Sequence, residues 1–171
     1  MDDIENDLKA FLAGRERSRG LGAVGRGLRD AAVTIVERFI RRLRADRALP
    51  AATARSNGDF EDHVASYVTD LAQALVAIGE ENSDVSALVR DGVHIQDLIS
   101  RLHGLQRARL GWTETMLVRE FTILREEIES AVRQHAATPE DFRAAMYLIN
   151  WHLSRAERLT MQEFRAEMGT A

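Results

Sequence analysis

The stretch His103–Arg125, HGLQRARLGWTETMLVREFTILR, decides the expected fold. Leu110-Gly111 is a helix stop signal, because glycine readily takes the left-handed conformation that ends many helices. Thr113 is a good N-cap for a new helix. Apolar residues recur at helical spacing on both sides of this turn. Because the turn around Gly111 is short, we predict that the two helices it joins are antiparallel.

Polar side chains gather on these two helices where the apolar pattern does not require them. His103 and Arg107 lie one turn apart on the first helix. On the second, Glu120 and Arg125 fall at the borders of the apolar face when each residue turns by about 100°. Charged groups there must find partners or reach solvent. We expect all four to meet in a semi-buried network, which either responds to pH or a small ligand or is purely structural.

Three further helices are expected from the same periodicity. They span about residues 28–44, 59–78 and 138–167, while the first helix of the pair starts near 84–93. Thr138-Pro139-Glu140-Asp141 is a clear helix start. The chain has only two prolines, and β-branched alternation is scarce. We therefore predict an all-α, antiparallel five-helix bundle. Its expected core stripes include Val33, Val36, Phe39, Ile40 and Leu43 in the first long helix, and Ile95, Leu98, Leu102 and Leu105 before the turn.

Residues 1–27 are expected to form an N-terminal extension and a linker before a helical domain at 28–171. Residues 2–12 have an amphipathic pattern, but a helix this short is stable only if it docks. Residues 14–27 are GRERSRGLGAVGRG, which is typical of a flexible connector. Gly20–Gly25 matches the GxGxxG pattern of dinucleotide folds. However, no strand precedes it, so we expect no phosphate site there.

Composition narrows the classes of function. A net charge of −4 gives no basic footprint for nucleic acid. No run approaches the roughly 18–20 apolar residues of a membrane span. The acidic start MDDIENDLKAF does not resemble a secretory signal, so we expect a cytoplasmic protein. There is no cysteine, which excludes disulfides and thiolate chemistry.

The sequence contains no complete catalytic or metal-binding motif. We find no nucleophile with its base, no paired catalytic carboxylates and no cluster of metal ligands, and therefore expect no enzymatic activity, no metal and no cofactor. Two alternatives stay open. One is histidine phosphotransfer at His103, although Arg107 stands where that motif has glycine. The other is haem held through His94, His103 or His152.

Two surfaces are candidates for contact with a partner or a second copy. Gly104 and Ala108 lie one turn apart and form a smooth patch that another helix can approach closely. Tyr147 and Trp151 form an aromatic pair on the last helix, and aromatic residues are enriched at interfaces. The alternative for the aromatic pair is that the N-terminal helix covers it.

The polar residues around the turn also carry a family resemblance. Its residues are His103-Gly104, Arg107, Gly111, Glu120-Phe121 and Leu124-Arg125, with Arg44 to Pro50 and Asp62-His63 in the earlier helices. In these residues the chain resembles the N-terminal domain of RsbRD-type proteins, found in RsbR-like co-antagonists of RsbT and in some bacterial histidine kinases. The resemblance covers about residues 28–135. It departs from the family at Phe121, where the family often has tyrosine, and residues 136–171 do not contain a STAS or kinase module.

The resemblance implies a sensory input domain of bacterial signal transduction, of the stress-response or two-component type. It also implies a homodimer, a downstream kinase or STAS-type partner, and a fold that is globin-like without haem. We therefore expect a non-catalytic sensory or regulatory domain that relays a signal through helix packing.

Overall fold

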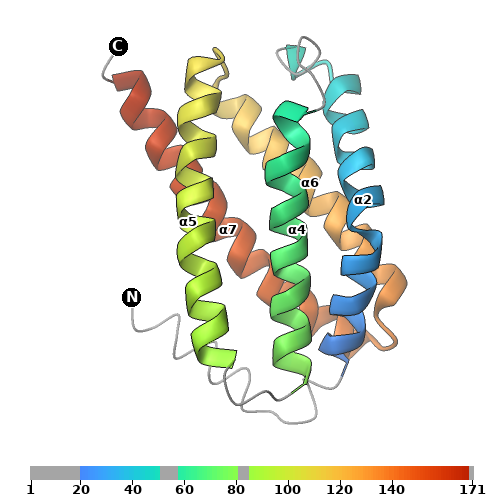
Figure 1. Cartoon of the computed structure of the whole chain (residues 1–171). Helices are drawn as coiled ribbons and strands as arrows, with labels where there is room; N and C mark the ends of the chain where they lie inside the picture. The colour runs from blue at the N-terminus through green and yellow to red at the C-terminus, as the bar shows by residue number, and fades with distance from the viewer. Residues whose placement is uncertain (1–19, 51–57, 81–84, 170–171) are drawn as a thin grey trace.

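The structure is a computed structural model that describes residues 20–50, 58–80 and 85–169. Its elements are five α-helices, and the described residues contain no strand (Figure 1). The expected all-α helical bundle is confirmed. The expected helix at residues 2–12 lies outside the described residues. The helices are α2 (Leu21–Ala45), α4 (Gly58–Gly79), α5 (Val85–Arg109), α6 (Glu114–His135) and α7 (Pro139–Gly169).

The helices form two layers, with α5, α4 and α2 in front of α6 and α7, which cross behind them (Figure 1). The most extensive contacts join α2 to α4 and α5 to α7, followed by α2 to α6 and α6 to α7. The contact between α4 and α5 is slight by comparison. The expected packing of α5 along α6 is therefore wrong. The two helices separate after the turn, because α5 packs on α7 while the apolar stripe of α6 packs on α2 and α7.

Helix α2 begins at Leu21, so the expected linker at residues 21–27 is wrong. Two of the glycines there, Gly22 and Gly25, lie where α2 packs closely on α4 rather than in a flexible linker. A Cβ atom on Gly25 would lie 2.6 Å from the carbonyl oxygen of Ala72, and one on Gly79 would lie 2.2 Å from the backbone nitrogen of Gly22. The helical domain therefore includes Leu21 onward rather than starting at residue 28.

Helix α5 is turned opposite to the expected orientation. Ile95, Leu98 and Leu102, expected in the core, are 59%, 59% and 51% exposed. The buried face is instead the smooth one with Gly104 and Ala108. Val33 on α2, also expected in the core, is 72% exposed.

The smooth face of α5 lies against α7. A Cβ atom on Gly104 would come within 2.2 Å of the carbonyl oxygen of Thr160. The Thr160 hydroxyl donates a hydrogen bond of 3.0 Å to the carbonyl oxygen of Ser100. Gly104 and Ala108 are thus used inside this chain, and the expectation that they form a dimer surface is wrong.

The turn between α5 and α6 follows its sequence signals. Gly111 has a φ of 73°, and its N–H donates to the carbonyl oxygen of Ala108 at 3.0 Å. The backbone N–H of Trp112 donates to the carbonyl oxygen of Arg107 at 3.1 Å, which completes a Schellman motif. The Thr113 side chain accepts from the backbone of Met116 and caps α6. This geometry sets the start of α6, and with it the position of Glu120.

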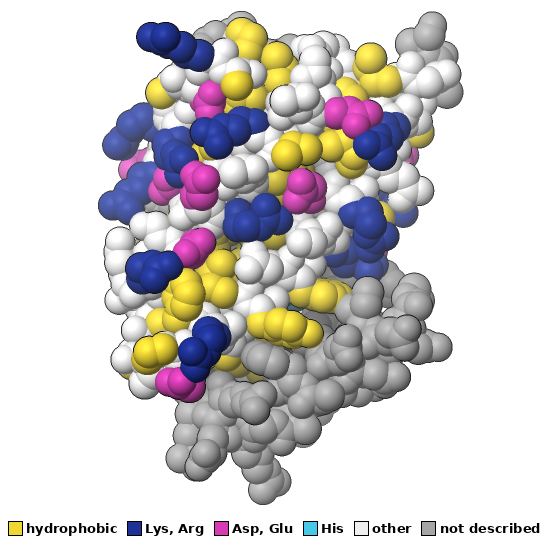
Figure 2. Space-filling view, turned by 180° about the vertical axis from the view of Figure 1, so that it is seen from behind, with side chains coloured by type: hydrophobic (Ala, Val, Ile, Leu, Met, Phe, Trp, Pro, Cys, Tyr) yellow, Lys and Arg dark blue, Asp and Glu magenta, His cyan; other side chains and the backbone are white. Residues whose placement is uncertain are grey.

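The apolar stripes of α2, α4, α6 and α7 supply most of the core. The five apolar residues that recur at helical spacing in α6 are all buried: Leu117, Phe121, Leu124, Ile128 and Val132. On the opposite side of the molecule from the view of Figure 1, arginine and acidic side chains are interspersed with apolar ones (Figure 2). Among the described helices, none is both long enough and apolar enough to cross a membrane.

Candidate functional site: a buried ion pair beside an apolar pocket

Glu120 and Arg107 form an ion pair shielded from solvent. Glu120 is 3% exposed and Arg107 is 1% exposed. The Arg107 Nη2 donates to Glu120 Oε1 at 2.6 Å, and Nε lies 3.2 Å from Oε2. The Arg107 guanidinium also lies over the ring of Trp112, 4.5 Å from its centre. The pair links α5 to α6 just beyond the turn that joins them.

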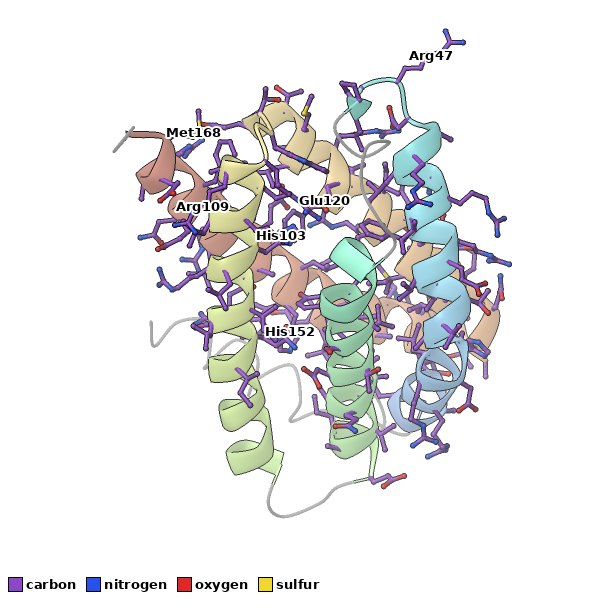
Figure 3. The ribbon with its side chains drawn as sticks, turned by 45° about the horizontal axis from the view of Figure 1, so that its top comes forward. Arg47, His103, Arg109, Glu120, His152 and Met168 are labelled. Atoms are coloured by element: carbon purple, nitrogen blue, oxygen red, sulfur yellow. The ribbon has the colours of Figure 1, made fainter. Side chains whose placement is uncertain are left out.

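His103 completes this network from one turn earlier on α5. Its Nε2 lies 3.0 Å from Glu120 Oε2, and its side chain is 13% exposed. The imidazole meets the edge of Phe121 at 6.3 Å between ring centres. Figure 3 shows His103 and Glu120 lying together between α5 and α6. A largely covered, hydrogen-bonded histidine is poorly placed for phosphotransfer, which needs an exposed ring.

The Glu120 carboxyl stays ionised despite its burial. Burial alone raises its pKa, but the electrostatic interactions and hydrogen bonds with His103 and Arg107 outweigh this effect and lower the pKa to about 2. Since an unpaired buried charge is costly, the carboxylate and Arg107 depend on each other.

Arg125 does not join this network. Its Nη2 lies 3.2 Å from Glu157 Oε2 on α7, with both side chains partly exposed. Five residues along a helix turn the side-chain direction by about 140° from Glu120, away from α5. The expected network therefore contains His103, Arg107 and Glu120, while the expectation for Arg125 is wrong.

An apolar pocket opens beside the network, and all five helices contribute to it. It has about 50 Å³ of room for the centres of water-sized molecules, and about 450 Å³ when the space at its mouth is included. His103 and Glu120 form part of its wall. The remaining lining residues are Phe39, Val64, Tyr67, Ile99, Ser100, Phe121, Leu124, Ala156 and Thr160.

A smaller polar pocket of about 10 Å³ shares Tyr67, Ser100 and Ala156 with the apolar one. Arg155 and Asp97 close it with two hydrogen bonds of 2.7 and 2.6 Å. His152 also lines it, and burial together with the charge of Arg155 lowers the pKa of this histidine to about 4. The imidazole is therefore neutral at pH 7.

The expected aromatic surface on α7 is only partly open. Tyr147 is 41% exposed, whereas Trp151 is partly buried with its ring edge-on to His152 at 4.6 Å. The alternative cover by the N-terminal segment falls outside the described residues, as does the side chain of His94. The described residues contain no group of three or more side chains arranged to hold a metal ion.

Sequence reasoning missed Tyr67 as a polar residue of the site. Tyr67 recurs with apolar residues at helical spacing in α4, and it is buried there. Its hydroxyl, however, has no hydrogen-bond partner. A tyrosine within a buried stripe is itself a signal, because its hydroxyl needs a partner when buried.

Comparison with protein-family models, curated proteins and solved structures found no match to this chain.

The lowered pKa values of His152 and Glu120 predict that the chain loses stability in acid. The pKa of His152 is lower in the folded chain, so stability is lost as pH falls from about 6.5 towards 4. The pKa of Glu120 is also lower, so its contribution is lost as pH falls from about 4.5 towards 2. Each contribution is at most about 3 kcal/mol. Urea unfolding at pH 7, 5 and 3 measures both.

His152→Gln is the control for the effect of His152, and it should remove most of the change in the free energy of unfolding between pH 7 and pH 5. If the free energy of unfolding changes equally with pH in the wild type and this variant, His152 titrates normally in the folded chain.

Proposed function

We propose that this chain is a non-catalytic sensory or regulatory domain of a signal-transduction protein, in which the pocket receives a small ligand and α5 relays its presence. The observation that carries the proposal is the buried Arg107–Glu120 pair, with His103, in the wall of an apolar pocket lined by all five helices. Binding in such a pocket acts on the position of several helices at once.

Helix α5 is the best candidate for the relaying element. It packs mainly on α7 and only slightly on α4. Its inner face reaches the pocket through Ile99, Ser100 and His103, while its outer face exposes Ile95 and Leu98. A shift of α5 therefore changes both the pocket and an exposed apolar surface. Helix shifts of this kind are a common switching motion.

The signalling context rests on the resemblance to RsbRD-type domains. It adds a cytoplasmic location, a homodimer and a downstream kinase or STAS-type partner to the proposal. Since Gly104 and Ala108 are covered by α7, such a dimer would use another surface. A globin-like arrangement of the helices belongs to the same resemblance.

Filling the pocket with a side chain tests the relay without knowledge of the ligand. Val64 on α4 is 7% exposed and lines the pocket, so Val64→Phe places a ring there. We expect amide hydrogen exchange in residues 95–109 of α5 to speed up about tenfold or more, because opening of α5 becomes easier by about 1.4 kcal/mol. Mass spectrometry of α5 peptides measures the change.

Val33→Phe is the matched control, since it makes the same change at a site that is 72% exposed. Ala156→Val fills the same pocket from α7, so it shows whether the faster exchange in α5 depends only on the change in α4. If both filled variants remain folded by circular dichroism and α5 exchanges as in the control, the relay is rejected and the network is purely structural.

A further inference from the structure

The strongest sign of a ligand is the hydroxyl of Tyr67. The side chain is 8% exposed and lines both the apolar and the polar pocket. Its oxygen has no hydrogen-bond partner, and burial raises the pKa of the phenol, so it remains a neutral donor. More than about nine in ten buried polar groups have a partner, which makes this hydroxyl an exception.

A second polar atom without a partner lines the polar pocket. Gln96 donates through its Nε2 to Asp70, which fixes the orientation of the amide because a carboxylate oxygen only accepts. Its Oε1 is buried and has no hydrogen-bond partner. The polar pocket is thus lined by one residue with a buried donor that lacks a partner, the Tyr67 hydroxyl, and one with a buried acceptor that lacks a partner, Gln96 Oε1.

Most of the other polar groups of the two pockets are already engaged, and the neutral imidazole of His152 also lines the polar pocket. Ser100 donates to the carbonyl oxygen of Gln96 at 2.7 Å. Among the described residues that line these pockets, each carboxylate has an arginine partner: Glu120 has Arg107, and Asp97 has Arg155. A charged ligand would lose its water without gaining a counter-charge, which is costly.

We infer that the apolar pocket and the adjoining polar pocket together bind a small neutral alcohol. Its hydroxyl accepts a hydrogen bond from Tyr67 and donates one to Gln96 Oε1, while its apolar body lies against Val64 and Leu124. A single hydroxyl satisfies both atoms because it both donates and accepts. At 10–15 Å³ for each water-sized group, the room of about 50 Å³ suits a body of about four carbon atoms. This inference rests on the proposed function and names its ligand class.

The test titrates the full chain with 1-butanol and follows the methyl resonances of Val64, Ile99 and Leu124 by NMR. Tyr67→Phe removes only the hydroxyl oxygen. We expect the dissociation constant of 1-butanol to rise about fivefold to tenfold in this variant, as for the loss of one hydrogen bond. 1-Chlorobutane, which has a similar shape and no hydroxyl, should bind the wild type and the variant equally.

Butylamine and butyrate serve as charged probes and should leave the three methyl resonances unchanged. Equal affinity of 1-butanol for the wild type and Tyr67→Phe would overturn the inference. So would a wild type whose resonances do not respond to 1-butanol, which would mean that the polar pocket holds only water. Neither result touches the response of α5 to Val64→Phe, so the proposed function fails or survives separately.

Discussion

Replacing Glu120 with alanine is expected to destabilise the chain by about 3–5 kcal/mol, the usual cost of removing one partner from a buried ion pair. The reason is the surroundings of Arg107, whose side chain is only 1% exposed. Without Glu120, the guanidinium loses the carboxylate that accepts from its Nε and Nη2. The free energy of unfolding from urea denaturation measures the loss.

Glu157→Ala is the matched control, because it removes the carboxylate from the partly exposed pair with Arg125. Pairs that reach solvent contribute about 0–1 kcal/mol. The double variant Glu120→Leu with Arg107→Leu should recover part of the loss, since apolar residues can replace a buried pair. Equal losses for Glu120→Ala and Glu157→Ala would show that the buried pair has no special role in stability.

Replacing Gly104 with valine is expected to cost about 3 kcal/mol, at the upper end of the usual range for overpacking. The added Cβ would lie 2.2 Å from the carbonyl oxygen of Thr160, and this backbone atom can move only if α7 moves. Gly104→Ala should also destabilise the chain, although alanine favours a helix over glycine by about 1 kcal/mol. Thermal and urea unfolding measure both variants.

Gly22→Ala on α2 is the control for the glycine series. The nearest atom to a Cβ there is the flexible end of Arg26 at 3.4 Å, so the gain in helix propensity should prevail. A stabilising Gly104→Ala would contradict the close packing of α5 on α7.

The helix ends could be predicted from the sequence because they depend on local chemistry. Gly111 takes the positive φ expected of a C-terminal glycine, and Thr113 caps α6. Thr138 and Asp141 form the reciprocal hydrogen bonds of a capping box at the start of α7. Each signal involves residues within a few positions of one another, so a single sequence contains all the information.

The packing partners of each helix could not be predicted in the same way. Helix α5 has an apolar face with Leu98 and Leu102 and a smooth face with Gly104 and Ala108. Burial of large apolar side chains favours the first face, whereas close approach of two backbones favours the second. The structure uses the second, against α7. The glycines before residue 28 were misjudged for the same reason, since Gly25 packs against α4.

The candidate site was predicted in part. Glu120 falls at a border of the apolar face of its helix, and His103 and Arg107 lie one turn apart on the helix before it, which is why the sequence already points to a network. Tyr67 fits the apolar pattern of its helix, so only the structure reveals its hydroxyl without a partner. The pocket itself depends on contributions from five helices and has no local signature.

The distance between α4 and α5 tests most directly the central claim that the pocket controls α5. The chain has no cysteine, so spin labels can be attached to cysteines placed at the exposed positions Gln73 and Leu102. Electron spin resonance then gives the distribution of distances between the labels. We predict that Val64→Phe shifts this distribution by about 1–2 Å relative to Val33→Phe, as for other helix shifts. Identical distributions in these two folded variants would contradict the account.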